Sequence, residues 1–141
     1  QAHVYRVDAQ TGSVIELSLP SGLGTGNFRR VALASPSLMF GLVGNTILRT
    51  TNGQTWTVIG GPAGTSVEAL DVDRGFDPVV LFLAGSNGAW VSRDLGDTWE
   101  PTSGLPRRPR ANHLETVTYA NGKRSVGLST WNWSAWRADL T

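Results

Sequence analysis

Apolar residues occur along the chain in short runs of strand length, separated by polar turns rich in glycine, asparagine and serine. The segment 67–73 alternates apolar and acidic residues, which predicts a strand with one buried face. The segments 38–43 and 79–85 are apolar on both sides, which is typical of central strands covered on both faces. Apolar residues rarely recur at a helical spacing. The pattern therefore predicts an all-β protein.

These runs predict thirteen strands within a single segment, 1–141. Two strands fall in residues 1–20, four in 27–59, four in 66–101 and three in 112–141. The expected strands are 2–8, 13–18, 28–34, 38–43, 46–51, 55–59, 67–73, 79–85, 113–120, 123–130 and 135–140, with two more in the hairpin around 92–99. Glycine-rich connectors separate the groups and carry no sign of a phosphate-binding loop.

A polar turn at residues 92–99 carries the most informative motif of the chain. Its carboxylate and its two hydroxyls are short enough to hydrogen-bond local backbone groups and to close the turn. Its glycine stands where the backbone is expected to need a positive φ, and its tryptophan anchors the next strand. The five defining residues are Ser92, Asp94, Gly96, Thr98 and Trp99.

A second copy of this turn lies earlier in the chain, with asparagine in the aspartate position and one residue fewer. Its residues are Thr50, Asn52, Gly53, Thr55 and Trp56. Degenerate copies of the surroundings occur at residues 4–15 and 135–140. The copies align at steps of roughly 40–50 residues, a repeat length typical of a β-propeller blade. The aligned positions are Arg6, Arg49, Val91 and Arg137.

The turn at 92–99 resembles the Asp-box (BNR) motif, S/T-x-D-x-G-x-T-W, at all five defining positions. Families that carry this motif include sialidases, xyloglucanase-type glycoside hydrolases, sortilin-like receptors and photosystem-assembly propellers. The resemblance implies a partial β-propeller of about three four-stranded blades, with the box between the third and fourth strands. It also implies a structural role for the box residues, and it does not select a function because these families differ in chemistry.

The number of expected blades is too small to close a propeller ring. Three blades do not form a closed ring, since propellers typically have four to eight. Open blade faces expose apolar sheet, so we expect contact with further propeller blades from the same chain or from other protein chains.

Net charge, hydropathy and cysteine content limit the functions that the chain can have. The formal net charge is +1, which gives no case for nucleic acid or an anionic membrane. No apolar run approaches a membrane span, and the absence of cysteine excludes disulfides and thiolate metal sites. A chain that begins at Gln1 favours a processed, exported protein, which we expect to be extracellular or periplasmic.

Two segments are candidate ligand-binding sites. Arg107, Arg108 and Arg110 lie in a proline-stiffened connector, which is either a solvated loop or a docking site for carboxylate, sulfate or phosphate. Trp131 and Trp133 flank an asparagine in a hairpin turn. They either pack on a neighbouring blade or partner chain, or form an exposed platform for a sugar ring or a protein.

Catalytic residues are not identified by the sequence. His3 and His113 form no triad or metal-ligand pattern, and the spacing of Asp71, Asp73 and Asp77 does not fit a calcium loop. Glu68, Asp71 and Glu115 are conceivable members of a glycosidase carboxylate pair. No motif assigns them that role. We expect no metal, cofactor or catalytic residue in this segment.

Two functions follow as expectations. The first is a non-catalytic interaction module of an exported protein, which binds partner chains through open blade faces and binds glycan at the Trp131 and Trp133 turn. The alternative is a fragment of a secreted Asp-box glycoside hydrolase, similar to a sialidase or xyloglucanase, with catalytic residues partly outside this segment.

Overall fold

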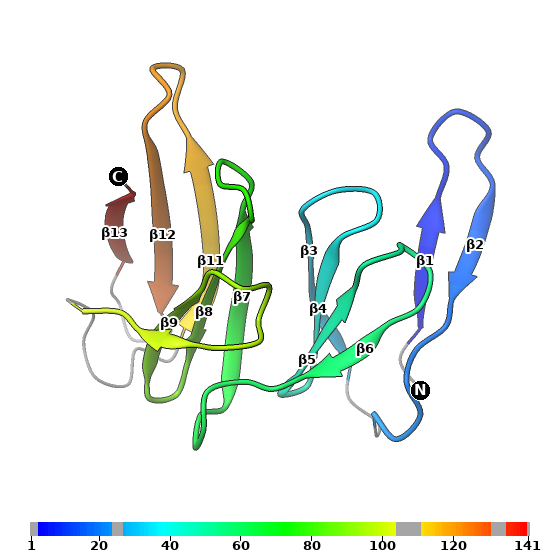
Figure 1. Cartoon of the computed structure of the whole chain (residues 1–141), viewed down its shortest axis with the longest axis horizontal. Coiled ribbons are helices and arrows are strands. Elements are labelled where there is room, and N and C mark those ends of the chain that lie inside the picture. Colours follow the sequence, from blue (N-terminus) through cyan, green and yellow to red (C-terminus); the bar gives the residue numbers. More distant parts are fainter. Residues whose placement is uncertain (1–2, 24–26, 104–110, 131–134, 141) are drawn as a thin grey trace. The chain divides into compact units, whose positions relative to one another are not determined.

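The computed structural model describes residues 3–23, 27–103, 111–130 and 135–140 (Figure 1). Within these residues the regular secondary structure is entirely β, so the all-β prediction is confirmed. No helix with the length and hydropathy of a membrane span occurs among them. The chain divides into two compact units, residues 1–59 and 60–141.

The first unit contains a hairpin and a four-stranded antiparallel sheet. The strands follow one another as neighbours, in the order β3-β4-β5-β6. The hairpin consists of β1 (Val4–Val7) and β2 (Val14–Leu17), and the sheet of β3 (Phe28–Leu33), β4 (Met39–Val43), β5 (Thr46–Thr50) and β6 (Thr57–Ile59).

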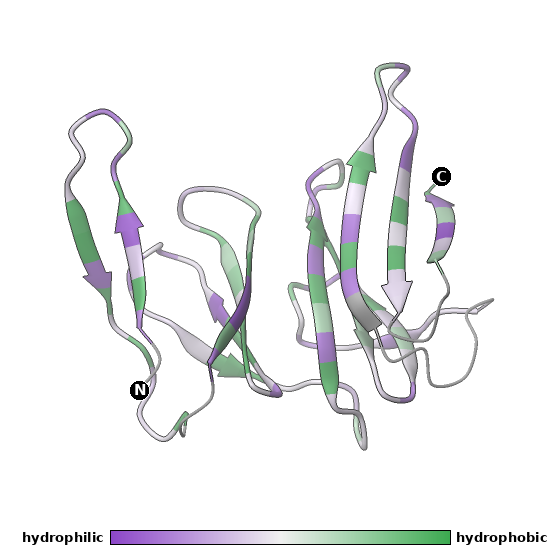
Figure 2. Cartoon of the chain, turned by 180° about the vertical axis from the view of Figure 1, so that it is seen from behind, coloured by the Kyte–Doolittle hydropathy of each residue, from purple (hydrophilic) through white to green (hydrophobic). Residues whose placement is uncertain are grey.

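The second unit contains a four-stranded and a three-stranded sheet, both antiparallel, in the orders β10-β9-β8-β7 and β11-β12-β13. The first consists of β7 (Val67–Asp73), β8 (Val80–Gly85), β9 (Gly88–Ser92) and β10 (Glu100–Pro101). The second consists of β11 (Ala111–Thr118), β12 (Arg124–Thr130) and β13 (Ala135–Leu140). Figure 2 shows apolar and hydrophilic residues alternating along β7.

The core of the first unit joins its hairpin to its sheet. Leu17 at the end of β2 is buried in one cluster with Met39, Val43, Leu48 and Trp56. The Trp56 amide also donates a hydrogen bond to the Ser18 carbonyl at 3.3 Å. Trp56 therefore fastens the hairpin to the sheet through both its side chain and its backbone.

The core of the second unit joins its two sheets face to face. Val80, Phe82 and Ala84 of β8 are buried in one cluster with Leu114 of β11 and Leu128 of β12. These side chains come from alternate positions along β8, as expected for one face of a strand. The sheets therefore share a continuous apolar core.

Polar contacts hold these two sheets together along the edge formed by β7 and β11. The Thr116 amide donates to Asp71 Oδ2 at 2.7 Å, and its hydroxyl donates to the Val72 carbonyl at 3.0 Å. Arg124 of β12 lies 3.5 Å from Asp73 Oδ1 and stacks over the Phe76 ring. The two sheets are thus closest along β7 and β11.

Strand β6 begins two residues later than the sequence pattern predicts. The predicted strand starts at Thr55, whereas β6 starts at Thr57. Asn52 accounts for the difference, because its side-chain oxygen binds the Thr55 amide at 2.9 Å and holds that residue in the turn.

Trp56 tests the account of the first core. Trp56 is 4% exposed, so Trp56→Ala is expected to lower the free energy of unfolding by about 3–5 kcal/mol through lost burial and a residual cavity. Urea denaturation followed by circular dichroism measures this loss. Trp99→Ala is the matched control, since Trp99 holds the equivalent position but is only half-buried. Equal losses in the two variants would contradict this account.

Candidate functional site

The turn that joins β9 to β10, residues 92–99, is closed by the Asp94 side chain and is called the Asp94 turn. Asp94 Oδ1 accepts hydrogen bonds from the Ser92 hydroxyl at 2.7 Å and from the Thr98 amide at 2.9 Å. The Thr98 hydroxyl donates to the other carboxylate oxygen. Ser92 Oγ in turn accepts from the Gly96 amide at 2.8 Å. One carboxylate therefore organises both ends of the turn.

Two consecutive residues of the Asp94 turn have left-handed backbone conformations. Gly96 has a φ of 93°, which confirms the positive φ expected there. Leu95 has a φ of 61°, and no sequence signal predicts it because leucine rarely adopts this region. The hydrogen bonds on either side of Leu95 hold this conformation.

The turn that joins β5 to β6, residues 50–56, has the same design and is called the Asn52 turn. Asn52 Oδ1 accepts from the Gln54 and Thr55 amides, both at 2.9 Å, and from the Thr50 hydroxyl at 3.1 Å. Thr50 Oγ1 accepts from the Gly53 amide at 3.0 Å. An amide oxygen here makes the contacts that a carboxylate oxygen makes in the Asp94 turn.

Gly53 is required in the Asn52 turn for two reasons. Its φ is 69°, and a Cβ at this position would lie 2.5 Å from the Pro36 carbonyl oxygen. The turn therefore packs against the connection between β3 and β4, and only glycine leaves room for that backbone.

The two tryptophans that follow the turns differ in their environment. Trp56 packs edge-on against Phe28, with ring centroids 6.2 Å apart. Trp99 is half-buried, and its indole nitrogen donates to the Gly60 carbonyl at 2.9 Å. Both side chains anchor the chain as it leaves the turn.

The hydrogen bonds of the Asp94 turn favour the ionised carboxylate. The Thr98 hydroxyl is the largest cause that lowers the pKa of Asp94 from 3.8 to about 2, followed by the Thr98 amide and the Ser92 hydroxyl. In the hairpin turn of β1 and β2, the Thr11 and Gln10 amides likewise lower the pKa of Asp8. Both turns are therefore most stable with a charged aspartate.

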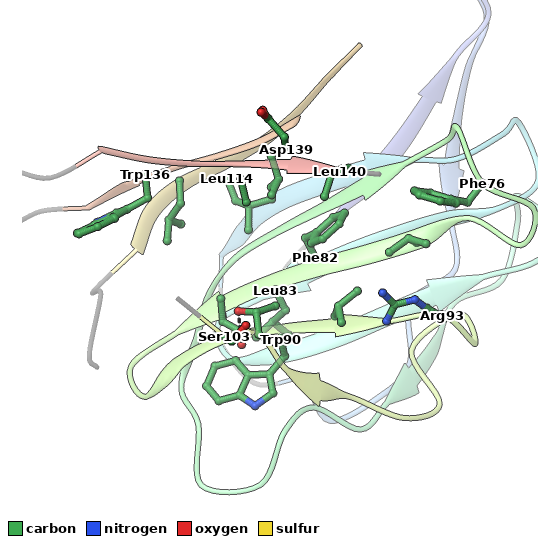
Figure 3. Close-up of a pocket in the computed structure, with 17 residues that line it drawn as sticks. Phe76, Phe82, Leu83, Trp90, Arg93, Ser103, Leu114, Trp136, Asp139 and Leu140 are labelled. Carbon is green, nitrogen blue, oxygen red and sulfur yellow. Dashed lines mark hydrogen bonds between the residues drawn. The ribbon is translucent and has the colours of Figure 1, made fainter. Parts of the chain in front are cut away.

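A slot of about 370 Å³ lies between the two sheets of the second unit and is the candidate binding site (Figure 3). One wall comes from β8 and β9, and the other from β11, β12 and β13. Aromatic residues Phe76, Phe82, Trp90 and Trp136 line it, and the remaining side chains are largely aliphatic. Its volume falls within the range of about 300–1,000 Å³ of ligand sites.

Polar groups occupy the margin of the slot. Arg93 forms an exposed ion pair with Glu100 at 3.2 Å, and Asp139 forms one with Arg137 at 3.3 Å. The Thr102 hydroxyl donates to the Ala89 carbonyl at 3.0 Å. Figure 3 shows the Asp139 carboxylate on the opposite side of β13 from Trp136. The slot is thus an apolar crevice with charges at its rim.

The ligand-binding residues predicted from the sequence lie outside the described residues. They are Trp131, Trp133, Arg107, Arg108 and Arg110. The predicted turn residues are all described, and each set of five comes together in one turn. Sequence reasoning missed the slot. Alternation of apolar and charged residues along 135–140 was the available signal, because it places Trp136, Ala138 and Leu140 on one face of β13.

The carboxylates considered for metal binding or catalysis have structural contacts. Asp71 accepts from the Thr116 amide, and Asp73 accepts from the Gly75 amide at 2.8 Å while it faces Arg124. Glu115 lies 3.6 Å from the His113 ring at an exposed position. The described residues contain no group of three or more potential metal ligands.

Comparison with known proteins identifies a fold and no family. No protein-family model matches the chain, and no curated protein matches its sequence. The structure is similar to a crystal structure of a protein of unknown function from Bacteroides caccae, with a TM-score of 0.52 and 12% sequence identity. The match covers 99% of this chain and 54% of that chain, so this chain spans about half the length of that protein. At this identity the likeness shows the fold alone.

Replacing Asp94 by asparagine, and Asn52 by aspartate, is expected to change how the stability of each turn depends on pH. The folded-state pKa of Asp94 lies below 3.8, so its contribution to stability is complete above that pH and is lost as the pH falls through about 2. Asp94→Asn removes this dependence and keeps an oxygen acceptor, as Asn52 does. We expect the melting temperature of the variant to fall less steeply than that of the wild type between pH 5 and pH 2.

Asn52→Asp provides the reciprocal control. A carboxylate in the Asn52 turn is expected to add acid sensitivity over the same interval, measured by thermal unfolding in matched buffers. Parallel pH profiles for the wild type and Asp94→Asn would show that the turn does not depend on the charge of Asp94.

Proposed function

We propose that the chain is a segment of an Asp-box β-propeller that acts as a non-catalytic interaction module of an exported protein. The observation that carries the proposal is the recurrence of one hydrogen-bonded turn. It joins the third and fourth strands in each of two consecutive four-stranded sheets with the same strand order. The three-stranded sheet that follows repeats the order of the first three strands.

The burial of the central strands supports an arrangement of stacked sheets. Every residue of β4 and of β8 is buried, so both faces of each strand are covered. Propeller blades have this property because each blade packs between two others. The likeness to the Bacteroides caccae structure, at a TM-score of 0.52, is a likeness of fold alone.

An exposed apolar face on the first hairpin supports the interaction role. Tyr5, Val7 and Val14 lie on one face of β1 and β2 and are 54%, 62% and 60% exposed. Contiguous apolar residues on a protein surface mark an interaction site. We propose that this face binds further propeller blades, from the same chain or from other protein chains, in an extracellular or periplasmic setting. Glycan binding at the Trp131 and Trp133 turn is a second element of the proposal.

Introduction of positive charges on the hairpin face tests the interaction role. In light scattering, the 141-residue chain is expected to form a defined species larger than its monomer mass of 15.1 kDa. The double variant Val7→Lys/Val14→Lys is expected to return the mass to that of the monomer without loss of β structure, because a lysine on each strand charges the apolar face. Ile15→Lys, at an exposed apolar position on the opposite face of the same hairpin, is the matched control.

Two results would contradict the proposal. A wild-type chain that is a folded monomer at all concentrations and binds no hydrophobic dye would show that the hairpin face is inert. Hydrolysis of a sialoside or a xyloglucan oligosaccharide by the purified chain would show that the segment is catalytic and would favour the glycoside hydrolase alternative.

A further inference from the structure

Asparagine followed by glycine occurs three times in this chain, each time at a turn between neighbouring antiparallel strands. The pairs are Asn52-Gly53, Asn87-Gly88 and Asn121-Gly122, and their glycines have φ values of 69°, 148° and 77°. The turns use the pair for its conformation. The same pair is also chemically reactive, because glycine has no side chain to shield its amide nitrogen from the asparagine carboxamide.

The reaction is an intramolecular substitution that needs only water. The glycine amide nitrogen loses its proton and attacks asparagine Cγ. The N–Cγ bond forms, the Cγ–Nδ2 bond breaks, and Nδ2 takes up a proton from water and leaves as ammonia. Water then opens the resulting succinimide at either carbonyl, which gives aspartate or isoaspartate. In a folded protein the rate therefore depends on how easily hydrogen bonds release the glycine amide and the carboxamide into the reactive geometry.

Asn52 is protected by the hydrogen bonds that close its turn. Its Oδ1 accepts from the Gln54 and Thr55 amides, and its Nδ2 donates to Thr55 Oγ1 at 2.9 Å. The nucleophile is held as well, because the buried Gly53 amide donates to Thr50 Oγ1 at 3.0 Å. The attack requires all of these bonds to break together.

Asn87 is held by a contact with another part of its unit. Its Nδ2 donates to the Gly64 carbonyl at 2.6 Å, which ties the leaving group to the connection before β7. Gly88 is the first residue of β9 and pairs with Gly85 of β8. The carboxamide and the glycine of this pair are therefore both held by the sheet.

Asn121 lies in the least anchored of the three turns. Residues 119–123 are all exposed, and Figure 1 shows them at the free end of the β11–β12 hairpin. The Gly122 amide donates to the Tyr119 carbonyl at 2.9 Å, and Asn121 Oδ1 accepts from the Lys123 amide at 3.0 Å. A Cβ at Gly122 would meet nothing within 4 Å. Both bonds lie within the exposed turn, so local opening releases them while β11 and β12 stay paired.

We propose that Asn121 is a site of spontaneous deamidation in the folded protein, whereas Asn52 and Asn87 are protected by the fold. The product places a negative charge next to Lys123 and cancels the formal net charge of +1. An aspartate at this position keeps an oxygen acceptor for the Lys123 amide. An isoaspartate adds a methylene group to the backbone and displaces the Gly122 amide from the Tyr119 carbonyl. The inference is independent of the proposed function, since it uses no residue of the β1–β2 hairpin.

Mass spectrometry of the full chain after storage in mildly alkaline buffer tests the proposal. Peptide mapping separates the three sites, because each conversion adds about 1 Da to its peptide. In the folded chain Asn121 is expected to react at least about tenfold faster than Asn52 or Asn87, because only its turn opens without loss of buried or sheet contacts. In concentrated urea the three rates are expected to converge.

Two variants test the physical cause. Asn121→Gln is expected to remove the fast reaction at this site, because the longer side chain would have to close a larger ring. Thr50→Val removes the acceptor of the Gly53 amide and is expected to raise the rate at Asn52 by about threefold or more, with the rate at Asn121 unchanged. Circular dichroism checks that each variant keeps its β structure. The comparison of the folded wild type with the wild type in urea needs neither variant.

Three outcomes would overturn the proposal. The first is a rate at Asn121 that is no higher than the rates at Asn52 and Asn87 in the folded chain. The second is the same order of rates in urea, since local sequence and not the fold would then determine it. The third is an unchanged rate at Asn52 in a folded Thr50→Val variant, which would show that the turn bonds do not protect this asparagine.

Discussion

The central strands of this protein have no solvent-facing side, and this constraint determines much of the rest. Every residue of β4 and β8 is buried, so each strand needs apolar cover on both faces and a hydrogen-bonded strand on both edges. In the second unit, β11 and β12 provide one such cover for β8 through Leu114 and Leu128. Farther from this contact the two sheets are less tightly packed, because the side chains of β13 line a slot instead of a filled core.

The turns between the third and fourth strands of the two four-stranded sheets fix the position of a very short fourth strand. Strand β10 has two residues and β6 has three, too few to define their own position by pairing. The Asp94 and Asn52 turns place them with side-chain bonds to the backbone, followed by an anchored tryptophan. An amide oxygen in the Asn52 turn and a carboxylate oxygen in the Asp94 turn accept equivalent hydrogen bonds, so either acceptor closes the turn, while the hydrogen bonds of the Asp94 turn favour the ionised carboxylate. The turns therefore belong to the architecture, and binding chemistry has to be sought elsewhere.

Local patterns predicted the strands and both turns, because periodicity and turn chemistry act over a few residues. The continuous apolar runs at 38–43 and 79–85 correspond to the two buried central strands. The same reasoning missed the slot, since its width depends on how far two sheets diverge beyond the contact of β7 with β11. It also missed the left-handed Leu95, whose conformation follows from hydrogen bonds made by its neighbours. The ligand-binding candidates at 107–110 and 131–133 lie outside the described residues, so they remain predictions.

Amide hydrogen exchange tests the account most directly, because β8 is buried at every position and paired on both edges, whereas β13 pairs only with β12 among the described residues. In the isolated chain, amides of β8 are expected to exchange slowest. Along β13 alternate amides should be protected by β12, and those between them should exchange rapidly from the open edge. Uniform slow exchange along β13, at a rate close to that of β8, would contradict the account, because it would show that the edge is already covered.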